Sequence, residues 1–242
     1  MLKRWMIKYK KLLGLITRTF YITALMKGVA AAIEHESILA RSKSKTIIDV
    51  GANRGQFSLA ARNTLPHARI YAFEPLRNPI RKFDELFSGD SQVRLFPFAL
   101  GSQSGETMMH VSRRDDSSSL LPIGEEQSRI FPKTQEIGVD IIQLKTLDEV
   151  LTGTNLKRPV LLKIDVQGYE LEVLKGAREL LKKIDIVYIE CSFKELYINQ
   201  PLITEVMQFL FENGFNLKGV YNQATDNDGS SIQADFYFES AS

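Results

Sequence analysis

The stretch Ile47-Ile-Asp-Val-Gly-Ala-Asn-Arg-Gly55 decides the fold of this 242-residue chain. It begins in a short apolar run, Thr46–Val50, that predicts a strand, and it opens a segment over residues 53–63 with the pattern of a helix. Gly51 supplies backbone freedom for a tight turn, and Gly55 lets the start of the helix approach a ligand closely. This unit predicts an α/β domain with a ligand site at the end of the strand.

Strand and helix signals alternate after this unit. Further strands are predicted over residues 69–73, 93–100, 160–164, 184–189, 215–221 and 234–239, and further helices over residues 78–87, 169–182 and 202–212. Repeated strand–helix units of this length predict a Rossmann-like architecture, in which seven strands form a mostly parallel, doubly wound sheet.

The alternation fails between residues 101 and 144. We expect an insertion of strand pieces and loops there, with a strand over residues 107–111 and a polar loop over residues 113–119. Insertions in doubly wound folds often cover the ligand site, so this one is the candidate lid over the substrate. Beyond it, Thr146-Leu-Asp-Glu149 predicts a capping box that opens a short helix.

The ends of the first two predicted strands carry groups suited to an amino acid joined to a nucleoside. Asp49 can accept a hydrogen bond from an ammonium group, and the N–H groups at the start of the following helix suit a carboxylate. Glu74 ends the second strand, 23 residues after Gly51. This is about the separation at which a carboxylate meets ribose hydroxyls. S-adenosylmethionine contains all three groups.

A second block, residues 161–177, contains a buried strand, a turn and a helix in succession. Its strand ends at Asp165, and the carboxyl ends of strands line the crevice where doubly wound folds bind ligands. We therefore expect Asp165 in the same crevice as Glu74, with Glu190, which ends the next strand, beside it. Lys163 lies on the same side of the strand as Asp165. We expect its amine to extend to the sheet edge, and the alternative is an ion pair with an acid in the crevice.

Together these blocks resemble the FkbM family of S-adenosylmethionine-dependent methyltransferases. The matching pieces are Asp49-Val-Gly-Ala-Asn-Arg-Gly55, Phe73-Glu-Pro75, Ala99-Leu-Gly101 with the Gly105-Glu106 turn, Ser118-Ser-Leu120, Thr146-Leu-Asp148 and residues 162–177. The resemblance runs from about residue 45 to the C-terminus and implies a class I methyltransferase domain over residues 45–242. It also implies O-methylation of a hydroxyl on a sugar, glycolipid or natural product.

The resemblance further implies which residues hold the cofactor. The cofactor residues are Asp49, Gly51, Asn53, Gly55, Gln56, Glu74 and Pro75, with Asp165 close by and with Phe98 and Ala99 near the adenine. The candidate catalytic residues are Asp165, Glu190 and Lys163. A hydroxyl nucleophile has to lose its proton, and Asp165 is our candidate for the general base. Its alternative role is to hold the cofactor's amino group or the following turn. His110 is a second candidate base, and we expect no metal.

The first 44 residues lie outside the resemblance and form a basic arm. Residues 1–45 carry ten Lys or Arg against two Glu, a net charge of +8, whereas the rest of the chain sums to −6. Apolar residues recur at three- and four-residue steps, which predicts an amphipathic helix: Leu2, Trp5, Met6, Tyr9, Leu12, Leu13, Ile16 and Phe20. A second helix is predicted over residues 24–39 and a linker over residues 41–45. The arm is expected to pack on the domain or on a second subunit of a homodimer. The alternative is contact with an anionic membrane surface.

No apolar run reaches the roughly 18 residues needed to span a bilayer, so we expect a cytoplasmic protein, either free or peripheral at a membrane. Three other functions are alternatives for such a fold. A nicotinamide-dependent oxidoreductase needs a third glycine after Gly55 that this chain lacks. A non-catalytic nucleotide-binding or membrane-adaptor protein would keep the fold alone. Nucleic-acid methylation is not expected because the catalytic body is acidic, so the expected partner is a small-molecule or glycan acceptor.

Overall fold

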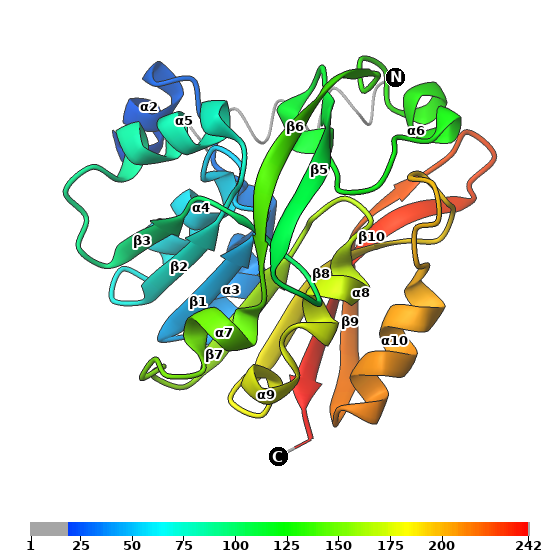
Figure 1. The fold of residues 1–242 in the computed structure, drawn as a ribbon. Coiled ribbons are helices and arrows are strands. Elements are labelled where there is room, and N and C mark those ends of the chain that lie inside the picture. The colour runs from blue at the N-terminus through cyan, green and yellow to red at the C-terminus, as the bar shows by residue number, and fades with distance from the viewer. Residues whose placement is uncertain (1–18, 242) are drawn as a thin grey trace.

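The computed structural model describes residues 19–241, which contain a central sheet of seven strands and a smaller sheet of three (Figure 1). The central sheet has the order β3-β2-β1-β7-β8-β10-β9. Its strands are β1 (Thr46–Val50), β2 (Arg69–Phe73), β3 (Val93–Phe96), β7 (Val160–Ile164), β8 (Ile186–Ser192), β9 (Phe215–Thr225) and β10 (Ser231–Ser240). The five neighbouring strands β3, β2, β1, β7 and β8 are parallel to one another, and β10 is antiparallel to both of its neighbours, β8 and β9. The predicted mostly parallel sheet of seven strands is confirmed.

Helices cover both faces of this sheet. On one side lie α2 (Thr19–Met26), α3 (Glu36–Ser42), α4 (Gln56–Thr64) and α5 (Arg77–Phe87), and on the other lie α7 (Leu147–Leu151), α8 (Glu170–Lys175), α9 (Arg178–Leu181) and α10 (Ile203–Glu212). The central strands β1 and β7 are buried along their whole length, as strands covered on both faces must be. Their apolar sequences, rather than an alternating pattern, follow from this position.

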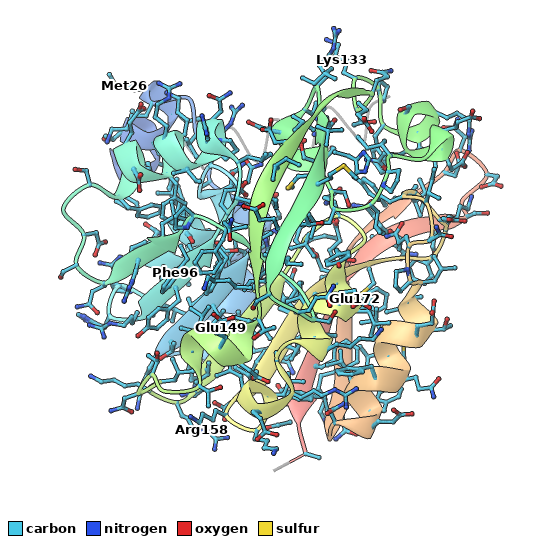
Figure 2. The ribbon with its side chains drawn as sticks, in the orientation of Figure 1. Met26, Phe96, Lys133, Glu149, Arg158 and Glu172 are labelled. Carbon is cyan, nitrogen blue, oxygen red and sulfur yellow. The ribbon has the colours of Figure 1, made fainter. Side chains whose placement is uncertain are left out.

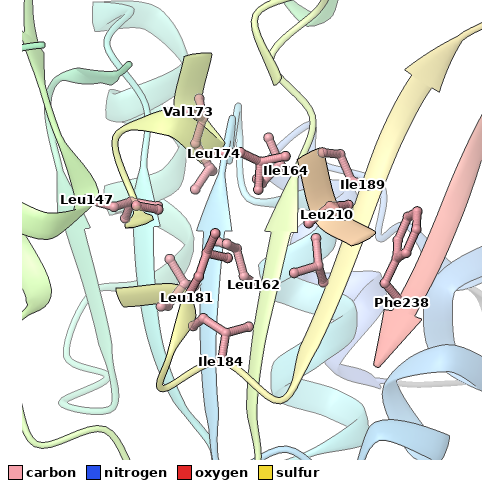
Figure 3. Close-up of a cluster of buried hydrophobic side chains, with 14 of the residues drawn as sticks. Leu147, Leu162, Ile164, Val173, Leu174, Leu181, Ile184, Ile189, Leu210 and Phe238 are labelled. Atoms are coloured by element: carbon pink, nitrogen blue, oxygen red, sulfur yellow. The ribbon is translucent and has the colours of Figure 1, made fainter. Parts of the chain in front are cut away.

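The larger core lies under α7 to α10 (Figure 3). Leu162, Ile164 and Ile189 point from the sheet into it, and Leu210 of α10 and Leu174 of α8 meet them there. Alternate residues of the same strands point to the opposite face of the sheet, where they pack against α3 and α4. Each fully buried side chain of this size contributes about 1.5–3 kcal/mol, so the sheet positions are fixed strongly.

The insertion forms its own small sheet, in the order β4-β6-β5. Its strands are β4 (Ala99–Leu100), β5 (Gly105–Ser112) and β6 (Glu136–Lys145), and the short helices η2 (Asp115–Ser117) and α6 (Glu125–Ile130) lie between β5 and β6. The strand predicted within residues 107–111 is confirmed as part of β5. The long strand β6 was not predicted as a separate strand, although residues 136–141 alternate between polar and apolar positions as strands do; the consecutive Ile141 and Ile142 interrupt the alternation.

Three predicted elements are wrong because a single residue interrupts each. The predicted helix over residues 24–39 breaks at Gly28, whose φ of +80° ends α2, and the chain resumes as η1 (Ile33–His35) and α3. The predicted strand over residues 93–100 breaks at Pro97 into β3 and β4, which lie in different sheets. The predicted helix over residues 169–182 breaks at Gly176, where a Cβ atom would lie 1.9 Å from the carbonyl oxygen of Gly101.

The predicted cap at Thr146 is confirmed. Thr146 caps α7 by accepting a hydrogen bond from the backbone N–H of Glu149 at 3.1 Å. The lone cysteine, Cys191, is buried in the larger core. Within residues 19–241, no helix is both long enough and apolar enough to cross a bilayer. The amphipathic helix predicted for the first part of the arm lies outside the described residues, apart from Phe20.

Candidate active site

A cavity of about 490 Å³ lies at the carboxyl ends of the parallel strands. The ends of β1, β2 and β7 contribute Gly51, Glu74 and Asp165 to its wall, so the three chain segments that the sequence assigned to one crevice do meet there. This is the edge where open α/β sheets bind ligands. Its volume is in the usual range for small-molecule sites.

Gly51 and Gly55 both have positive φ angles, of +77° and +90°, but they serve different neighbours. A Cβ atom on Gly51 would lie 1.8 Å from the carbonyl oxygen of Asp165, so this glycine lets the ends of β1 and β7 approach each other. A Cβ atom on Gly55 would lie 2.8 Å from the ring of Phe87. Gly55 therefore lets α4 begin against α5, and it lies outside the cavity lining.

The backbone N–H groups of residues 51–55 are all bonded inside the protein. Those of Gly51 and Ala52 reach the carbonyl of Phe73, and those of residues 53–55 reach Glu74, the Asn53 side chain and Ala52. The expectation that this turn offers free N–H groups to a carboxylate is therefore wrong for these five positions. The turn is held by its own hydrogen bonds and by the end of β2.

Glu74 stands directly after β2 and is only 5% exposed. Its Oε2 accepts the N–H of Asn53 and its Oε1 accepts the N–H of Leu76, each at 2.9 Å. Burial raises the pKa of Glu74 to about 7, although these two N–H groups oppose the shift. A carboxylate oxygen has more than one acceptor site, so Glu74 can still receive hydroxyl hydrogen bonds from a ligand in the cavity.

Lys163 joins two carboxylates beneath the cavity. Its Nζ lies 3.3 Å from Oδ1 of Asp49 and 3.6 Å from Oδ2 of Asp165, and it donates to the carbonyl of Gly51 at 3.2 Å. Burial lowers the pKa of Lys163, but the charges of Asp49 and Asp165 outweigh burial and raise it overall. The expectation that this amine extends to the sheet edge is wrong, because β7 is a central strand. The alternative, an ion pair in the crevice, is confirmed.

Asp49 itself lies outside the cavity lining. It is fully buried, and its Oδ2 accepts the hydroxyl hydrogen of Ser58 at 2.6 Å. Its contact with Lys163 places it behind the wall that Lys163 and Asp165 form. A direct contact between Asp49 and a ligand's ammonium group stays a prediction.

Asp165 and Glu190 face the same part of the cavity and share one amide. Nε2 of Gln167 donates to Oδ1 of Asp165 at 2.8 Å and to Oε2 of Glu190 at 3.1 Å. Burial and then the charge of Asp165 raise the pKa of Glu190 well above its usual range. The hydroxyl of Tyr197 donates to Oε1 of Gln167 at 2.7 Å, which fixes the orientation of the amide. Gln167 was not named among the predicted site residues, although it lies within the recognised motif.

The insertion closes over this end of the cavity. Arg114, Asp115 and Ser118 line the cavity, and Nε of Arg54 in the first turn donates to Asp115 at 2.8 Å. The buried Ser119 donates to the carbonyl of Gln167 at 2.6 Å. These contacts tie the lid to both halves of the site, which supports the interpretation of the insertion as a substrate lid. His110, by contrast, pairs with Glu136 within the insertion at 2.8 Å and does not line the cavity.

A polar cluster that the sequence did not reveal completes the wall. His35, Asn222 and Asp235 line the cavity, and the hydroxyl of Tyr188 joins them by donating to Asp235 at 2.9 Å. Nδ1 of His35 lies 2.9 Å from the same hydroxyl. Burial lowers the pKa of His35 despite the nearby charge of Asp235, which favours the neutral imidazole. These residues come from the arm and from β9 and β10, so no local motif unites them.

The cavity fits S-adenosylmethionine by its chemistry. Phe98, Ala99 and Pro75 line the cavity and give it an apolar wall, and their contact with an adenine stays a prediction. Asn53 and Gln56 also line the cavity, and the buried Oε1 of Gln56 has no hydrogen-bond partner within the described residues. An unpartnered buried acceptor beside carboxylates suits a ligand that is rich in N–H and O–H donors. Among residues 19–241, no group of three potential ligands is arranged to hold a metal ion.

Comparison with known proteins identifies the family. Residues 49–217 match the model of the methyltransferase FkbM domain. The chain is 24% identical over 198 residues to the 2-O-methyltransferase NoeI of Sinorhizobium fredii, covering 78% of this chain and 82% of NoeI. It is 30% identical over 144 residues to the hexuronic acid methyltransferase AglP of Haloferax volcanii, covering 59% of this chain and 54% of AglP.

A comparison with solved structures finds the same fold. The crystal structure of methyltransferase FkbM from Methylobacillus flagellatus superposes with a TM-score of 0.52 at 15% identity, covering 80% of this chain and 44% of that one. The range matched by the family model includes the strand ends that carry Gly51, Glu74, Asp165 and Glu190. With the family model matched from the end of β1 into β9, the chain belongs to the FkbM family and is a methyltransferase.

Proposed function

We propose that this protein transfers the methyl group of S-adenosylmethionine to a hydroxyl group of a sugar, a glycolipid or a related natural product. The observation that carries the proposal is the pair of carboxylates, Asp165 and Glu190, in the same cavity as the turn at Gly51 and the buried Glu74. The names of the relatives NoeI and AglP, a 2-O-methyltransferase and a hexuronic acid methyltransferase, favour a sugar acceptor.

In this proposal, one end of the cavity binds the cofactor and the other end binds the acceptor. Glu74, Gln56 and the apolar wall at Phe98 would hold the nucleoside of S-adenosylmethionine, whose sulfonium supplies an already activated methyl group. Asp165 and Glu190 lie at the end covered by the lid, where an acceptor can enter beside the methyl group. Holding two reactants in attack geometry can lower a barrier by about 7–11 kcal/mol.

In this proposal, Asp165 is the general base that removes the proton from the acceptor hydroxyl. Lys163 and the amide of Gln167 hold its two oxygens from the protein side, so its position is fixed before an acceptor arrives. Burial and the charge of Asp165 raise the pKa of Glu190, which favours its protonated form as a hydrogen-bond donor to an acceptor oxygen. A positioned base of this kind is worth typically 10²–10⁴-fold in rate.

Methyl transfer is tested with methyl-labelled S-adenosylmethionine and a panel of glycosides, both neutral hexosides and hexuronides. We expect label in a methyl ether, with an equal yield of S-adenosylhomocysteine. Asp165→Asn should bind S-adenosylhomocysteine as the unchanged protein does, and lose about 10²–10⁴-fold in turnover. Asp84→Asn, at an exposed position on α5, is the matched control and should change neither. Label on nitrogen only, or full turnover in Asp165→Asn, would contradict the proposal.

A further inference from the structure

The imidazole of His35 is held in one position in the cavity wall. Its ring packs edge-on against Phe57 of α4 and Tyr188 of β8, with ring centroids 5.4 and 5.5 Å apart. The backbone holds it as well, because the N–H of His35 donates to the carbonyl of Ala32 at 3.1 Å. The N–H of Ala32 in turn donates to the carbonyl of Gln56, the first residue of α4, at 3.0 Å. The orientation of the ring is therefore set before any ligand binds.

The hydrogen bonds around His35 decide which ring nitrogen carries the hydrogen. The hydroxyl of Tyr188 has one hydrogen, which it donates to Oδ2 of Asp235 at 2.9 Å. Nδ1 of His35 lies 2.9 Å from the same hydroxyl oxygen, so this contact is a hydrogen bond only if Nδ1 is the donor. Nδ2 of Asn222 lies 3.3 Å from Nδ1, but its shorter hydrogen bonds go to Asp235 and Tyr188, at 2.8 and 3.2 Å. The arrangement favours the tautomer with its hydrogen on Nδ1.

The other ring nitrogen, Nε2, is then a hydrogen-bond acceptor that faces open space. Burial lowers the pKa of His35, which favours the neutral ring. The charges of Asp235, Glu34 and Asp165 oppose this shift, and the charge of Lys163 adds to it. A neutral imidazole with its hydrogen on Nδ1 has a lone pair on Nε2. Within residues 19–241, Nε2 has no hydrogen-bond partner, and it is not one of the fully enclosed polar atoms that lack one. The open space that His35 lines is the active-site cavity.

The position in the sheet ties His35 to one end of this cavity. Asp235 is the direct partner of Glu190 in the register of β10 and β8, and both line the cavity. Glu74 follows β2, on the other side of β1 and β7. Figure 2 labels Phe96 at the end of β3, on the side of the sheet away from β8 and β10. The cluster around His35 therefore lies with Glu190, away from the end proposed for the nucleoside.

We propose that His35 binds the methyl acceptor, with Nε2 accepting a hydrogen bond from a second hydroxyl group of that molecule. Tyr188 does not line the cavity and is a positioning residue, because it reaches the acceptor only through Nδ1 of His35. The assignment rests on the proposed function, in which Asp165 takes the proton of the hydroxyl that is methylated. Two acceptor groups that face one ligand select a molecule with at least two hydroxyl groups, as sugars have, over a molecule with a single hydroxyl.

The tautomer of His35 tests this geometry without any turnover. The chain contains three histidines, so their ring signals can be assigned by substitution in the ¹⁵N-labelled full-length protein. At pH 7 we expect a neutral His35 with its hydrogen on Nδ1. Tyr188→Phe should move this hydrogen to Nε2, because Asn222 can then donate to Nδ1. Tyr221→Phe is the control and should leave it in place, since the hydroxyl of Tyr221 accepts from Arg41 instead. A charged ring at pH 7, or a hydrogen on Nε2 in the unchanged protein, overturns the proposal.

The same signals separate the acceptor from the cofactor. Saturation with S-adenosylhomocysteine should leave most of the Nε2 shift still to come, and the glycoside that is methylated in the turnover assay should then complete it. A shift that is complete with S-adenosylhomocysteine alone assigns Nε2 to the cofactor and overturns the proposal. If no glycoside is methylated, the proposed function fails, and the tautomer of His35 still shows whether its side of the inference is right.

Two substitutions distinguish acceptor binding from support of the fold. Asparagine at position 35 can keep an N–H toward Tyr188 but has no acceptor at the position of Nε2. Glutamine can bring its amide oxygen to that position and gives up the contact with Tyr188. We expect His35→Asn to lower kcat/KM for the acceptor about 3- to 10-fold, the effect of one neutral hydrogen bond, with the KM for S-adenosylmethionine unchanged.

His35→Gln should keep most of the acceptor affinity, and His67→Gln, at an exposed position, is the matched control and should match the unchanged protein. All three variants should bind S-adenosylhomocysteine normally, which shows that they are folded. A purely structural role gives the reverse order, with His35→Asn close to the unchanged protein and His35→Gln impaired. That order, or equal kcat/KM values in all four proteins, overturns the proposal.

Discussion

At the scale of single residues, Glu74 offers the most direct test of the cofactor half of the site. Its two oxygens are held by backbone N–H groups and it lines the cavity. We expect Glu74→Ala to weaken the binding of S-adenosylhomocysteine by at least about tenfold, because each charge-assisted hydrogen bond is worth about 1.5–3 kcal/mol. Titration calorimetry measures the change, with the exposed Glu179→Ala as control. Equal affinities in all three proteins would remove Glu74 from the site.

The same residue predicts a pH dependence of binding. The carboxylate accepts ribose hydroxyls when ionised, and burial raises its pKa to about 7 in the free protein. Below that value a proton must leave before the ligand binds. The affinity for S-adenosylhomocysteine should therefore rise with pH up to about 7 and level off above it, changing by about tenfold per pH unit on the acid side. Glu74→Gln should bind more weakly and lose this component of the dependence. A wild-type affinity that is flat from pH 5 to pH 8 contradicts the assignment.

Sequence reasoning placed the residues that stand at strand ends and missed those that only the assembled molecule brings together. Glu74, Asp165 and Glu190 were predictable because parallel strands must end at one edge of a sheet. His35 and Asp235 were not, because they are 200 residues apart and meet through the hydroxyl of Tyr188. The sequence also could not show that Lys163 would turn inward, since this depends on burial of Asp49 beneath it.

At the scale of elements, the junction between β1 and α4 depends on Gly51. Alanine there would force a left-handed backbone angle and place its methyl group 1.8 Å from a carbonyl oxygen of the loop after β7. We expect Gly51→Ala to lower the free energy of unfolding by about 2–5 kcal/mol and to abolish cofactor binding. Gly153→Ala is the control, because a Cβ atom there meets nothing within 4 Å, and it should change stability by no more than about 0.5 kcal/mol. Urea denaturation compares the two, and equal midpoints would contradict the role of Gly51.

Element boundaries were less predictable than the elements themselves. The apolar runs of β1, β7 and β8 are buried on both faces and leave little choice of structure. The helix pattern over residues 169–182, by contrast, continues through Gly176. Only the structure shows that the helix ends at this residue, which lies against the carbonyl group of Gly101. The strand β6 was missed although residues 136–141 alternate as a strand does, because the consecutive Ile141 and Ile142 interrupt the alternation.

In the whole molecule, the last strand of the chain is inserted inside the central sheet and is not added at its edge. The strand β10 lies between β8 and β9, and it carries Asp235 to the cavity. The family match ends at residue 217, before this strand begins. The part of the chain beyond the match therefore completes both the core and part of the cavity wall.

This arrangement predicts the effect of removing β10. A chain that ends at Thr225 loses the buried Phe236, Tyr237 and Phe238, each worth about 1.5–3 kcal/mol, and leaves β9 without its neighbour. Against a typical total stability of about 5–15 kcal/mol, this loss should abolish the cooperative unfolding transition. A single substitution in β10 tests the same point in a full-length chain, which avoids aggregation of the truncated protein. Phe238→Ala should lower the free energy of unfolding by about 3–5 kcal/mol. Phe211→Ala removes its exposed ring neighbour and should have an effect under about 1 kcal/mol, because little surface leaves water there. A truncated chain that still unfolds cooperatively and binds S-adenosylhomocysteine would show that residues up to 225 form the stable unit and that β10 is an addition to it.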